Sequence, residues 1–351
     1  MRLGIIGRAG AGKTTLFNAL TGSELPVGIP AGAGQLQVNS ATLDIPDPRL
    51  KALSDLYQPR KTTYAKATLS DIGGLQGEAG QTELPGALLD QLAQMEAFLL
   101  ALRGFEDPMS PGAPDPERDL VALETEFLLR DLLWVESRQG RLAEERQKGA
   151  RERGAIDREA ALLQRLAESL GQDRPLRGLS LTPEDERTLG GWGLLTRKPL
   201  LAVVNCGEER AEWPLPTQLT QLSVRGKLEM EIAQLPPEEA QEFRRDYGIA
   251  EPALDRVLRK AQTAMDRIAF FTVSEPEVRA WMLPAGATAL AAAGLIHTDL
   301  AHGFIRAEVI LWEELLELGG LAPARAQGKL RVEGKEYPLA DGEVIYIRFH
   351  V

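Results

Sequence analysis

The feature that most limits how this chain can fold is an octapeptide near its N-terminus, Gly7 to Thr14, which reads G-R-A-G-A-G-K-T. It follows the apolar run Leu3-Gly4-Ile5-Ile6 and matches G-x-x-x-x-G-K-[ST] at every fixed position. This motif joins a strand to a helix, and its backbone N–H groups surround a phosphate. The helix that follows directs the positive end of its dipole at the anion. The motif therefore predicts an α/β nucleotide-binding domain.

The residue types in this loop predict the role of each side chain in binding the nucleotide. Lys13 reaches the β- and γ-phosphate oxygens and stabilises the charge of the transferred group, which makes it a candidate catalytic residue. Thr14 offers its hydroxyl to Mg²⁺. The predicted nucleotide-binding residues of the loop are Gly7, Gly10, Ala11, Gly12, Lys13, Thr14 and Thr15.

A second motif lies at the end of an expected strand. Alternating apolar residues through Ala67 and Leu69 lead to Asp71, which opens the D-x-x-G pattern D-I-G-G. Asp71 is predicted to hold Mg²⁺ through water, and the backbone N–H of Gly74 to sense the γ-phosphate, as a second catalytic candidate. Many GTPases place a water-orienting glutamine directly after this motif. Leu75 stands there instead, so we expect slow hydrolysis.

A third motif follows an apolar run that reads as a strand buried on both faces of a parallel sheet, and it spells N-C-G-E from Asn205 to Glu208. GTPases carry N-K-x-D at this place, where the aspartate binds guanine. Here Glu208 replaces the aspartate and Cys206 the lysine, while an asparagine amide suits the adenine edge. We therefore expect ATP to be preferred over GTP, with GTP as a second nucleotide. Ser223 is a further candidate base contact, although an ordinary loop serine fits almost as well.

Composition narrows the class of protein. With 351 residues, of which 44% are hydrophobic, the chain is long enough for two or three domains. A single cysteine excludes an internal disulfide, and neither a signal peptide nor a run of about 20 apolar residues is evident. We expect a cytoplasmic protein without membrane contact. The net charge of −11 disfavours a general polyanion binder but leaves room for a local basic face.

These motifs, together with others in the C-terminal part, resemble the YchF/Obg-like ATPase family of translation-factor-related NTPases. The resemblance covers essentially the whole chain in order. It is carried by G-K-T-T-L-F-N-A-L-T (12–21), P-D-P-R-L (46–50), D-I-G-G-L (71–75), N-C-G-E (205–208), E-V-R-A-W (277–281), G-A-T-A (286–289), I-H-T-D (296–299) and G-F-I-R-A (303–307).

The resemblance implies an α/β fold in which a P-loop NTPase domain with a largely parallel sheet is interrupted by a helical, coiled-coil-like insert and followed by a small β-grasp (TGS) domain. The expected boundaries are 1–116 and 195–267 for the two parts of the P-loop domain, 117–194 for the insert and 268–351 for the TGS domain. The insert segment is supported independently by charges of alternating sign and apolar residues at helical spacing. Two antiparallel helices turning near residues 149–154 fit this pattern.

Three departures from the family pattern are expected to matter. Gly10 stands where the family usually has an asparagine that helps to bind K⁺, so K⁺ stimulation is not expected. Gln35 is the apparent counterpart of the first-switch threonine. The loop 107–112 lacks the family's proposed catalytic histidine. The three histidines, His297, His302 and His350, lie in the TGS region, where we expect structural roles such as helix capping.

The sequence therefore predicts a Mg²⁺-dependent nucleotide-binding protein that prefers ATP and hydrolyses it slowly to ADP. By resemblance, its macromolecular partner is the ribosome or ribosomal RNA. Two other interpretations stay open: a GTP-preferring ribosome-associated switch, and a nucleotide-binding scaffold without turnover. The oligomeric state and the cellular process stay open as well.

Overall fold

The computed structural model describes residues 1–27, 38–73, 86–108, 112–149 and 152–350. These residues form two compact units. Unit 1 consists of Met1–Ala41 and Thr68–Lys260, and unit 2 of Thr42–Ala67 and Ala261–Val351. Within the described ranges, no helix is both long and apolar enough to span a membrane.

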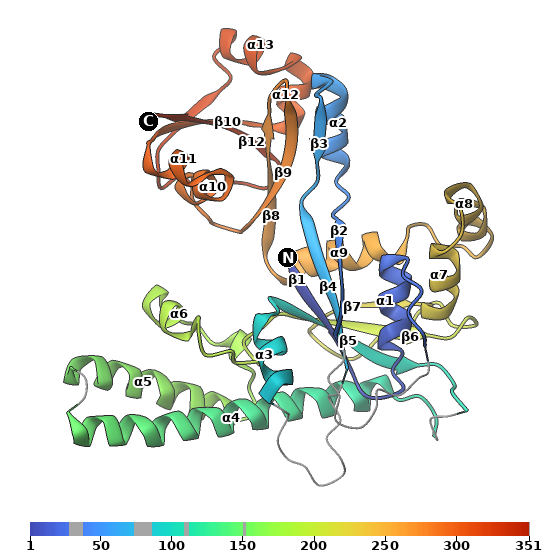
Figure 1. The fold of residues 1–351 in the computed structure, drawn as a ribbon, viewed down its shortest axis with the longest axis vertical. Coiled ribbons are helices and arrows are strands. Elements are labelled where there is room, and N and C mark those ends of the chain that lie inside the picture. Colours follow the sequence, from blue (N-terminus) through green and yellow to red (C-terminus); the bar gives the residue numbers. More distant parts are fainter. Residues whose placement is uncertain (28–37, 74–85, 109–111, 150–151, 351) are drawn as a thin grey trace. The chain divides into compact units, whose positions relative to one another are not determined.

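Unit 1 is built on a six-stranded sheet (Figure 1). In sheet order its strands are β2 (Val38–Asp44), β4 (Lys66–Ile72), β1 (Arg2–Ile6), β5 (Ala97–Gly104), β6 (Leu200–Cys206) and β7 (Thr220–Val224). From β4 to β7 every neighbouring pair is parallel. All residues of β6, and all but Arg103 of β5, are buried, as expected for central strands covered on both faces. The predicted α/β class with a largely parallel sheet is confirmed.

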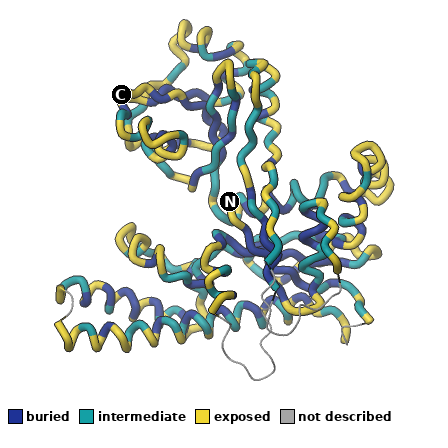
Figure 2. The backbone as a smooth tube through the Cα atoms, viewed as in Figure 1, coloured by how far each residue is buried: buried dark blue, intermediate teal, exposed yellow. Residues whose placement is uncertain are grey.

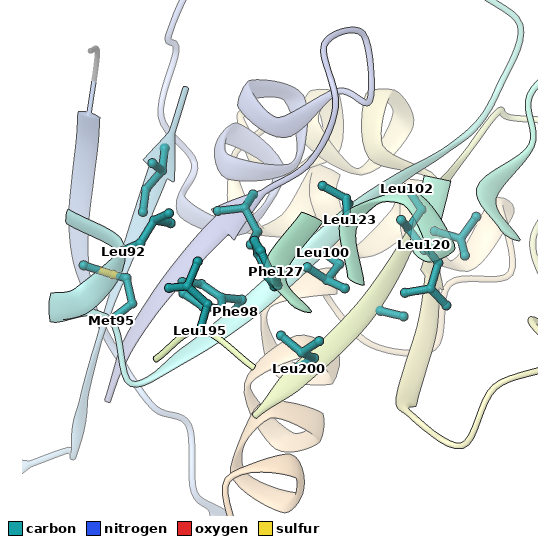
Figure 3. Close-up of a cluster of buried hydrophobic side chains, with 14 of the residues drawn as sticks. Leu92, Met95, Phe98, Leu100, Leu102, Leu120, Leu123, Phe127, Leu195 and Leu200 are labelled. Atoms are coloured by element: carbon teal, nitrogen blue, oxygen red, sulfur yellow. The ribbon is translucent and has the colours of Figure 1, made fainter. Parts of the chain in front are cut away.

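The helices α1 (Lys13–Thr21) and α3 (Gly86–Gln94) lie between strands of this sheet in the chain. The helices α7 (Gly226–Ala233), α8 (Pro237–Asp246) and α9 (Ala253–Ala264) follow its last strand, β7, and α8 packs on α7. Figure 3 shows the core at which α3 and the N-terminal part of the long helix α4 (Pro116–Lys148) meet β5. The rings of Phe98 on β5 and Phe127 on α4 lie 5.7 Å apart between centroids. The base of the insert is thus part of the same hydrophobic core as the nucleotide-binding sheet.

The insert is a pair of antiparallel helices, α4 with 33 residues and α5 (Arg153–Leu170) with 18 (Figure 1). Helix α4 begins at the cap Asp115, whose side chain accepts from the N–H of Arg118, and it ends at Gly149 with a positive φ of 61°. Buried and exposed residues alternate along both helices (Figure 2), because each buries one apolar face against the other. A short 3₁₀ turn, η1 (Leu176–Gly178), and α6 (Pro183–Leu189) lead back to β6. The predicted helical pair and its turn are confirmed.

Unit 2 is a mixed six-stranded sheet with helices on both faces. Its strands are, in sheet order, β11 (Arg331–Glu333), β10 (Phe304–Leu311), β12 (Glu343–Phe349), β8 (Arg267–Val273), β9 (Glu277–Pro284) and β3 (Lys61–Thr63). One face packs on α2 (Pro48–Tyr57), α12 (Trp312–Leu318) and α13 (Leu321–Ala326). The other face packs on α10 (Ala289–Ile296) and α11 (Thr298–His302).

Residues 42–67 lie in a different unit from the one that the sequence indicated. Residues 42–67 were assigned to the first part of the P-loop domain, but they belong to unit 2. The reason is physical: β3 pairs in parallel with β9, and α2 buries Leu50 and Leu53 in the unit 2 core. The other predicted domain boundaries stay a prediction.

Candidate functional site

The loop between β1 and α1 has the backbone that a phosphate-binding loop needs. Gly10 and Gly12 have φ values of 76° and 77°, a region that residues with a Cβ rarely adopt. Space is also restricted. A Cβ on Gly7 would lie 2.4 Å from the carbonyl oxygen of Ala101, and one on Gly12 would lie 2.1 Å from Nδ2 of Asn205. Packing therefore requires glycine at position 7, and packing and conformation together require it at position 12.

Lys13, the first residue of α1, extends its ammonium across this loop. Its Nζ donates to the carbonyl oxygens of Gly7 at 3.0 Å and Arg8 at 3.1 Å. Burial lowers the pKa of Lys13, and the nearby Asp71 carboxylate opposes that shift. A half-buried ammonium that donates to backbone carbonyl oxygens is well placed to bind an anion such as a phosphate.

The two predicted metal ligands meet. The Thr14 hydroxyl donates to Oδ2 of Asp71 at 2.7 Å, which joins the start of α1 to the carboxyl end of β4. Asp71 is 5% exposed, and burial raises its pKa, against the opposing effects of the Thr14 hydroxyl and Lys13. Hydroxyl and carboxylate oxygens are hard ligands of the kind Mg²⁺ prefers, and Mg²⁺ usually takes only one or two protein ligands beside phosphates.

Among the residues that the structure describes, no three or more His, Cys, Asp or Glu side chains gather as a metal cage. The Thr14–Asp71 pair supplies one hydroxyl and one carboxylate, a donor set of the kind that Mg²⁺ accepts beside phosphates and water.

Asn205 lies at the carboxyl end of β6 and is 3% exposed. Its Nδ2 donates to the carbonyl oxygen of Ala11 at 3.1 Å, and its Oδ1 accepts from the N–H of Gly226 at 3.1 Å. The side chain thus connects the phosphate-binding loop to the first residue of α7. Both ends of the amide are engaged in the protein, which leaves one N–H of the amide for a base.

The other predicted base contacts differ from Asn205 in their surroundings. Glu208 is exposed, and its Oε1 lies 3.8 Å from Nζ of Lys227 at the start of α7. The Ser223 hydroxyl accepts from the N–H of Trp213 at 2.9 Å, a bond that a structural loop serine would make. Cys206 is buried, and burial raises the pKa of its thiol. Of these three side chains, Glu208 is therefore the most accessible to a ligand.

Three comparisons with known proteins agree with this geometry. Residues 268–350 match a family model described as YchF-GTPase_C, a protein of unknown function (DUF933). The ribosome-binding ATPase YchF of Bacillus subtilis (strain 168) is 34% identical over 99% of both chains, and that of Escherichia coli O157:H7 is 33% identical over 100% of this chain and 99% of that one. The chain belongs to the YchF/Obg-like ATPase family.

More distant members of the YchF/Obg-like family match over the same length. Obg-like ATPase 1 of Oryza sativa subsp. japonica is 29% identical over 100% of this chain and 92% of its own. The structure of the Schizosaccharomyces pombe YchF GTPase superimposes with a TM-score of 0.82 at 26% identity, covering 99% of this chain and 97% of that one. The predicted family and its fold are thus confirmed over the full length.

Some residues predicted for this family site lie outside the described ranges. These are Gly74, Leu75 and Gln35, so their predicted roles stay predictions. His297, by contrast, is described: its Nδ1 accepts from the N–H of Asp299 at 3.2 Å, which makes it the cap of α11. Its expected structural role as a helix cap is confirmed.

Two side chains near the site were not predicted. Phe105, which follows β5, is half-buried, and its Cε1 would be 3.5 Å from a Cβ on Gly12. Arg8 in the loop places a guanidinium nitrogen 3.4 Å from Asp119 in the first turn of α4. The available signal for Phe105 was an aromatic residue directly after a central strand, where open α/β sheets bind ligands.

Proposed function

We propose that this protein binds Mg²⁺-ATP and hydrolyses it slowly, in association with ribosomes in the cytoplasm. The observation that supports this most is the meeting of Lys13, Thr14 and Asp71 at the carboxyl edge of the unit 1 sheet. Relatives are named ribosome-binding ATPases, which agrees with the proposal.

In this proposal each residue keeps a specific task. Lys13 neutralises the β- and γ-phosphate oxygens and the charge that develops on the transferred group, while the glycines of the loop, with Ala11 and Thr15, supply backbone contacts. Thr14 and Asp71 hold Mg²⁺, Asp71 through water, and Mg²⁺ supplies further charge neutralisation on the phosphates. Gly74 senses the γ-phosphate through its N–H.

For the base we propose a division of labour. Asn205 holds the phosphate-binding loop to α7. Its remaining amide N–H donates to N7 of the base, an acceptor that adenine and guanine share. Phe105 provides an aromatic face beside the loop, and stacking on it does not depend on which purine is bound. Glu208 is one methylene longer than the aspartate that GTPases use to bind guanine, and Cys206 lacks the length and the charge of their lysine, so ATP is preferred. Ser223 has a secondary part at most, since its hydroxyl already accepts from Trp213.

Lys13→Ala tests the phosphate site. The variant should lose ATP affinity by at least about tenfold to a hundredfold, because charge-assisted bonds contribute roughly 1.5–3 kcal/mol. Isothermal titration calorimetry with ATP, ADP, GTP and GDP, each with and without Mg²⁺, measures this directly. Lys227→Ala, an exposed lysine beside Glu208, is the matched control and should keep phosphate affinity. Equal ATP affinity in folded Lys13→Ala would remove the proposed site.

The same set of titrations separates the two alternative functions. A GTP-preferring switch should bind GTP orders of magnitude more tightly than ATP. A scaffold without turnover should bind ATP but leave it uncleaved in a single-turnover assay at high protein concentration. The proposed slow ATPase requires ATP preference together with measurable single-turnover cleavage.

For the ribosomal partner, we propose one contact surface on unit 2. On the sheet face formed by β11, β10 and β12, Val332 and Tyr346 lie in register on either side of the buried Glu308 and are 56% and 49% exposed. Glu308 fixes two guanidiniums, Arg325 at 2.5 Å and Arg348, and Arg325 lies 6.0 Å from the Tyr346 ring centroid.

This surface has the chemistry of a single-stranded RNA site. Arg306 lies opposite Arg348 in the register, so three arginines surround one exposed tyrosine in a chain whose net charge is −11. Guanidiniums bind phosphates, and an exposed tyrosine on a sheet stacks bases. Arg306→Ala with Tyr346→Ala should reduce co-sedimentation with ribosomes severalfold. Arg60→Ala, an exposed arginine beside β3 at the opposite edge of the sheet, is the control. Unchanged co-sedimentation of the double variant would exclude this surface.

A further inference from the structure

The six residues 194–199, which connect the insert to β6, bind two elements that are distant in the chain. The first is α4. The carboxylate of Asp131 on α4 is completely buried and accepts from the N–H of Leu195 at 3.0 Å, the N–H of Thr196 at 2.7 Å and the Thr196 hydroxyl at 2.7 Å. The neighbouring Arg130 adds a fourth donor at 3.2 Å, and the three donors from the turn fix the turn to α4 with little freedom.

The second element is α3. The ammonium of Lys198 donates to the carbonyl oxygens of Leu92 at 2.5 Å, Ala93 at 2.7 Å and Met95 at 2.6 Å. These carbonyls are at the C-terminal end of α3, where helix carbonyls lack partners within the helix and the dipole favours a cation. A lysine ammonium has three N–H donors, and each has an acceptor here. Its Nζ also lies 5.4 Å from the centroid of the Phe98 ring.

The turn is also tied to the remainder of the insert and to the phosphate-binding loop. The N–H of Arg177 in η1 donates to the carbonyl oxygen of Thr196 at 3.0 Å, and the Arg177 guanidinium pairs with Glu124 on α4. On its other side the turn runs directly into β6, whose Asn205 binds the carbonyl of Ala11.

We infer that the 194–199 turn couples the nucleotide site to the helical insert, with Lys198 and Asp131 as its two positioning residues. Among the residues that the structure describes, α3 is the first helix after Asp71 in the chain. Lys198 ties the far end of that helix to the turn, and Asp131 ties the turn to α4. A displacement of α3 that follows nucleotide binding is passed to α4, and by thermodynamic reciprocity a partner on the insert changes nucleotide affinity.

The inference rests on the proposed nucleotide binding, and it differs from a merely structural account of the same bonds. If the bonds only stabilise the fold, removing Lys198 lowers stability but leaves the response of the insert to nucleotide intact. If they couple the two sites, the response of the insert is lost while nucleotide still binds at the loop. The two accounts therefore predict different results in one measurement.

Hydrogen–deuterium exchange of the full chain, with and without Mg²⁺ and a non-hydrolysable ATP analogue, makes that measurement. In the wild type we expect slower exchange both in the phosphate-binding loop and in α4 and α5. Lys198→Met should keep the loop response and lose at least half of the insert response, and Lys198→Arg should restore it. Lys148→Met, an exposed lysine that pairs with Glu144 near the end of α4, should behave as the wild type.

Each outcome decides something. A full insert response in Lys198→Met, or a wild type whose loop responds while its insert does not, overturns the coupling. Absence of any response at the loop means instead that the proposed nucleotide binding is wrong, and the coupling falls with it. Should Lys198→Met fail to fold, Thr196→Val removes only the hydroxyl bond to Asp131 and should weaken the insert response in the same direction.

Discussion

Asn205→Ala distinguishes a residue that organises the phosphate-binding loop from one that reads the base. The substitution removes the donor to the Ala11 carbonyl and the acceptor of the Gly226 N–H in a place that is 3% exposed. Each buried group that is left without a partner costs about 1–3 kcal/mol. We therefore expect the free energy of unfolding to fall by about 2–4 kcal/mol, which a fold with a stability of about 5–15 kcal/mol survives.

The effect on binding should be the same for both purines. If the bond to Ala11 contributes about 1–1.5 kcal/mol to the ordered loop, affinities for ATP and for GTP both fall by about fivefold to tenfold. Urea denaturation gives the first quantity and calorimetry the second. Glu208→Ala, at an exposed site, is the control for stability and should leave the free energy of unfolding unchanged within about 0.5 kcal/mol.

The opposite pattern would refute this reasoning. If Asn205→Ala changes the ratio of ATP to GTP affinity by tenfold or more and leaves the free energy of unfolding unaltered, Asn205 is a base-reading residue. Its hydrogen bonds to Ala11 and Gly226 would then contribute little to either folding or loop order.

Three further predictions concern base choice, turnover and pH. Glu208→Asp combined with Cys206→Lys should raise GTP affinity relative to ATP by about 1–3 kcal/mol, measured by competition; a ratio that stays constant would remove the proposed role of the N-C-G-E motif. Basal ATP hydrolysis should be well below the roughly 1–100 s⁻¹ of kinases, insensitive to Leu75→Ala and, because Gly10 replaces an asparagine, nearly insensitive to K⁺; strong K⁺ activation would contradict this. Burial, followed by the charges of two nearby arginines, lowers the pKa of Lys198 to about 8. Between about pH 8 and 10.5 the unfolded chain therefore binds a proton that the folded chain has lost, so the wild type should gain stability over Lys198→Met as pH rises, by at most about 1.4 kcal/mol per pH unit. A difference in unfolding free energy that is constant from pH 7.5 to 10 would show that this pKa is not lowered.

Sequence motifs and apolar periodicity predicted those parts of the structure that are determined by residues close together in the sequence. Eight consecutive residues predict the phosphate-binding loop. The left-handed φ of Gly12 agrees with the glycine that the motif requires at this position. The helical pair follows from an apolar period that each helix satisfies against its neighbour. The approach of Thr14 to Asp71 was also predictable, because parallel strands bring their carboxyl ends to one edge of a sheet.

Long-range partners were not predictable in the same way. Nothing in residues 61–63 specifies that β3 pairs with β9. In that pairing Thr63 lies opposite Arg279, which is far along the chain. A three-residue strand carries too few side chains for its pattern to select a partner, so the pairing is determined by how α2 packs into the unit 2 core.

Lys198 in the 194–199 turn and its partner helix residue Asp131 show why a sequence can predict a binding site without predicting the contacts that connect the site to other elements. Lys198 and Asp131 stand in no motif, and each would be read as a solvated charge on a loop or a helix face. Their roles arise only when folding brings an ammonium to three helix-end carbonyls and a carboxylate to three donors. Burying a charge is costly unless it is hydrogen-bonded, and the ammonium of Lys198 and the carboxylate of Asp131 both meet that condition. The link that these two residues make, from α3 through the turn to α4, therefore becomes visible only in the folded structure.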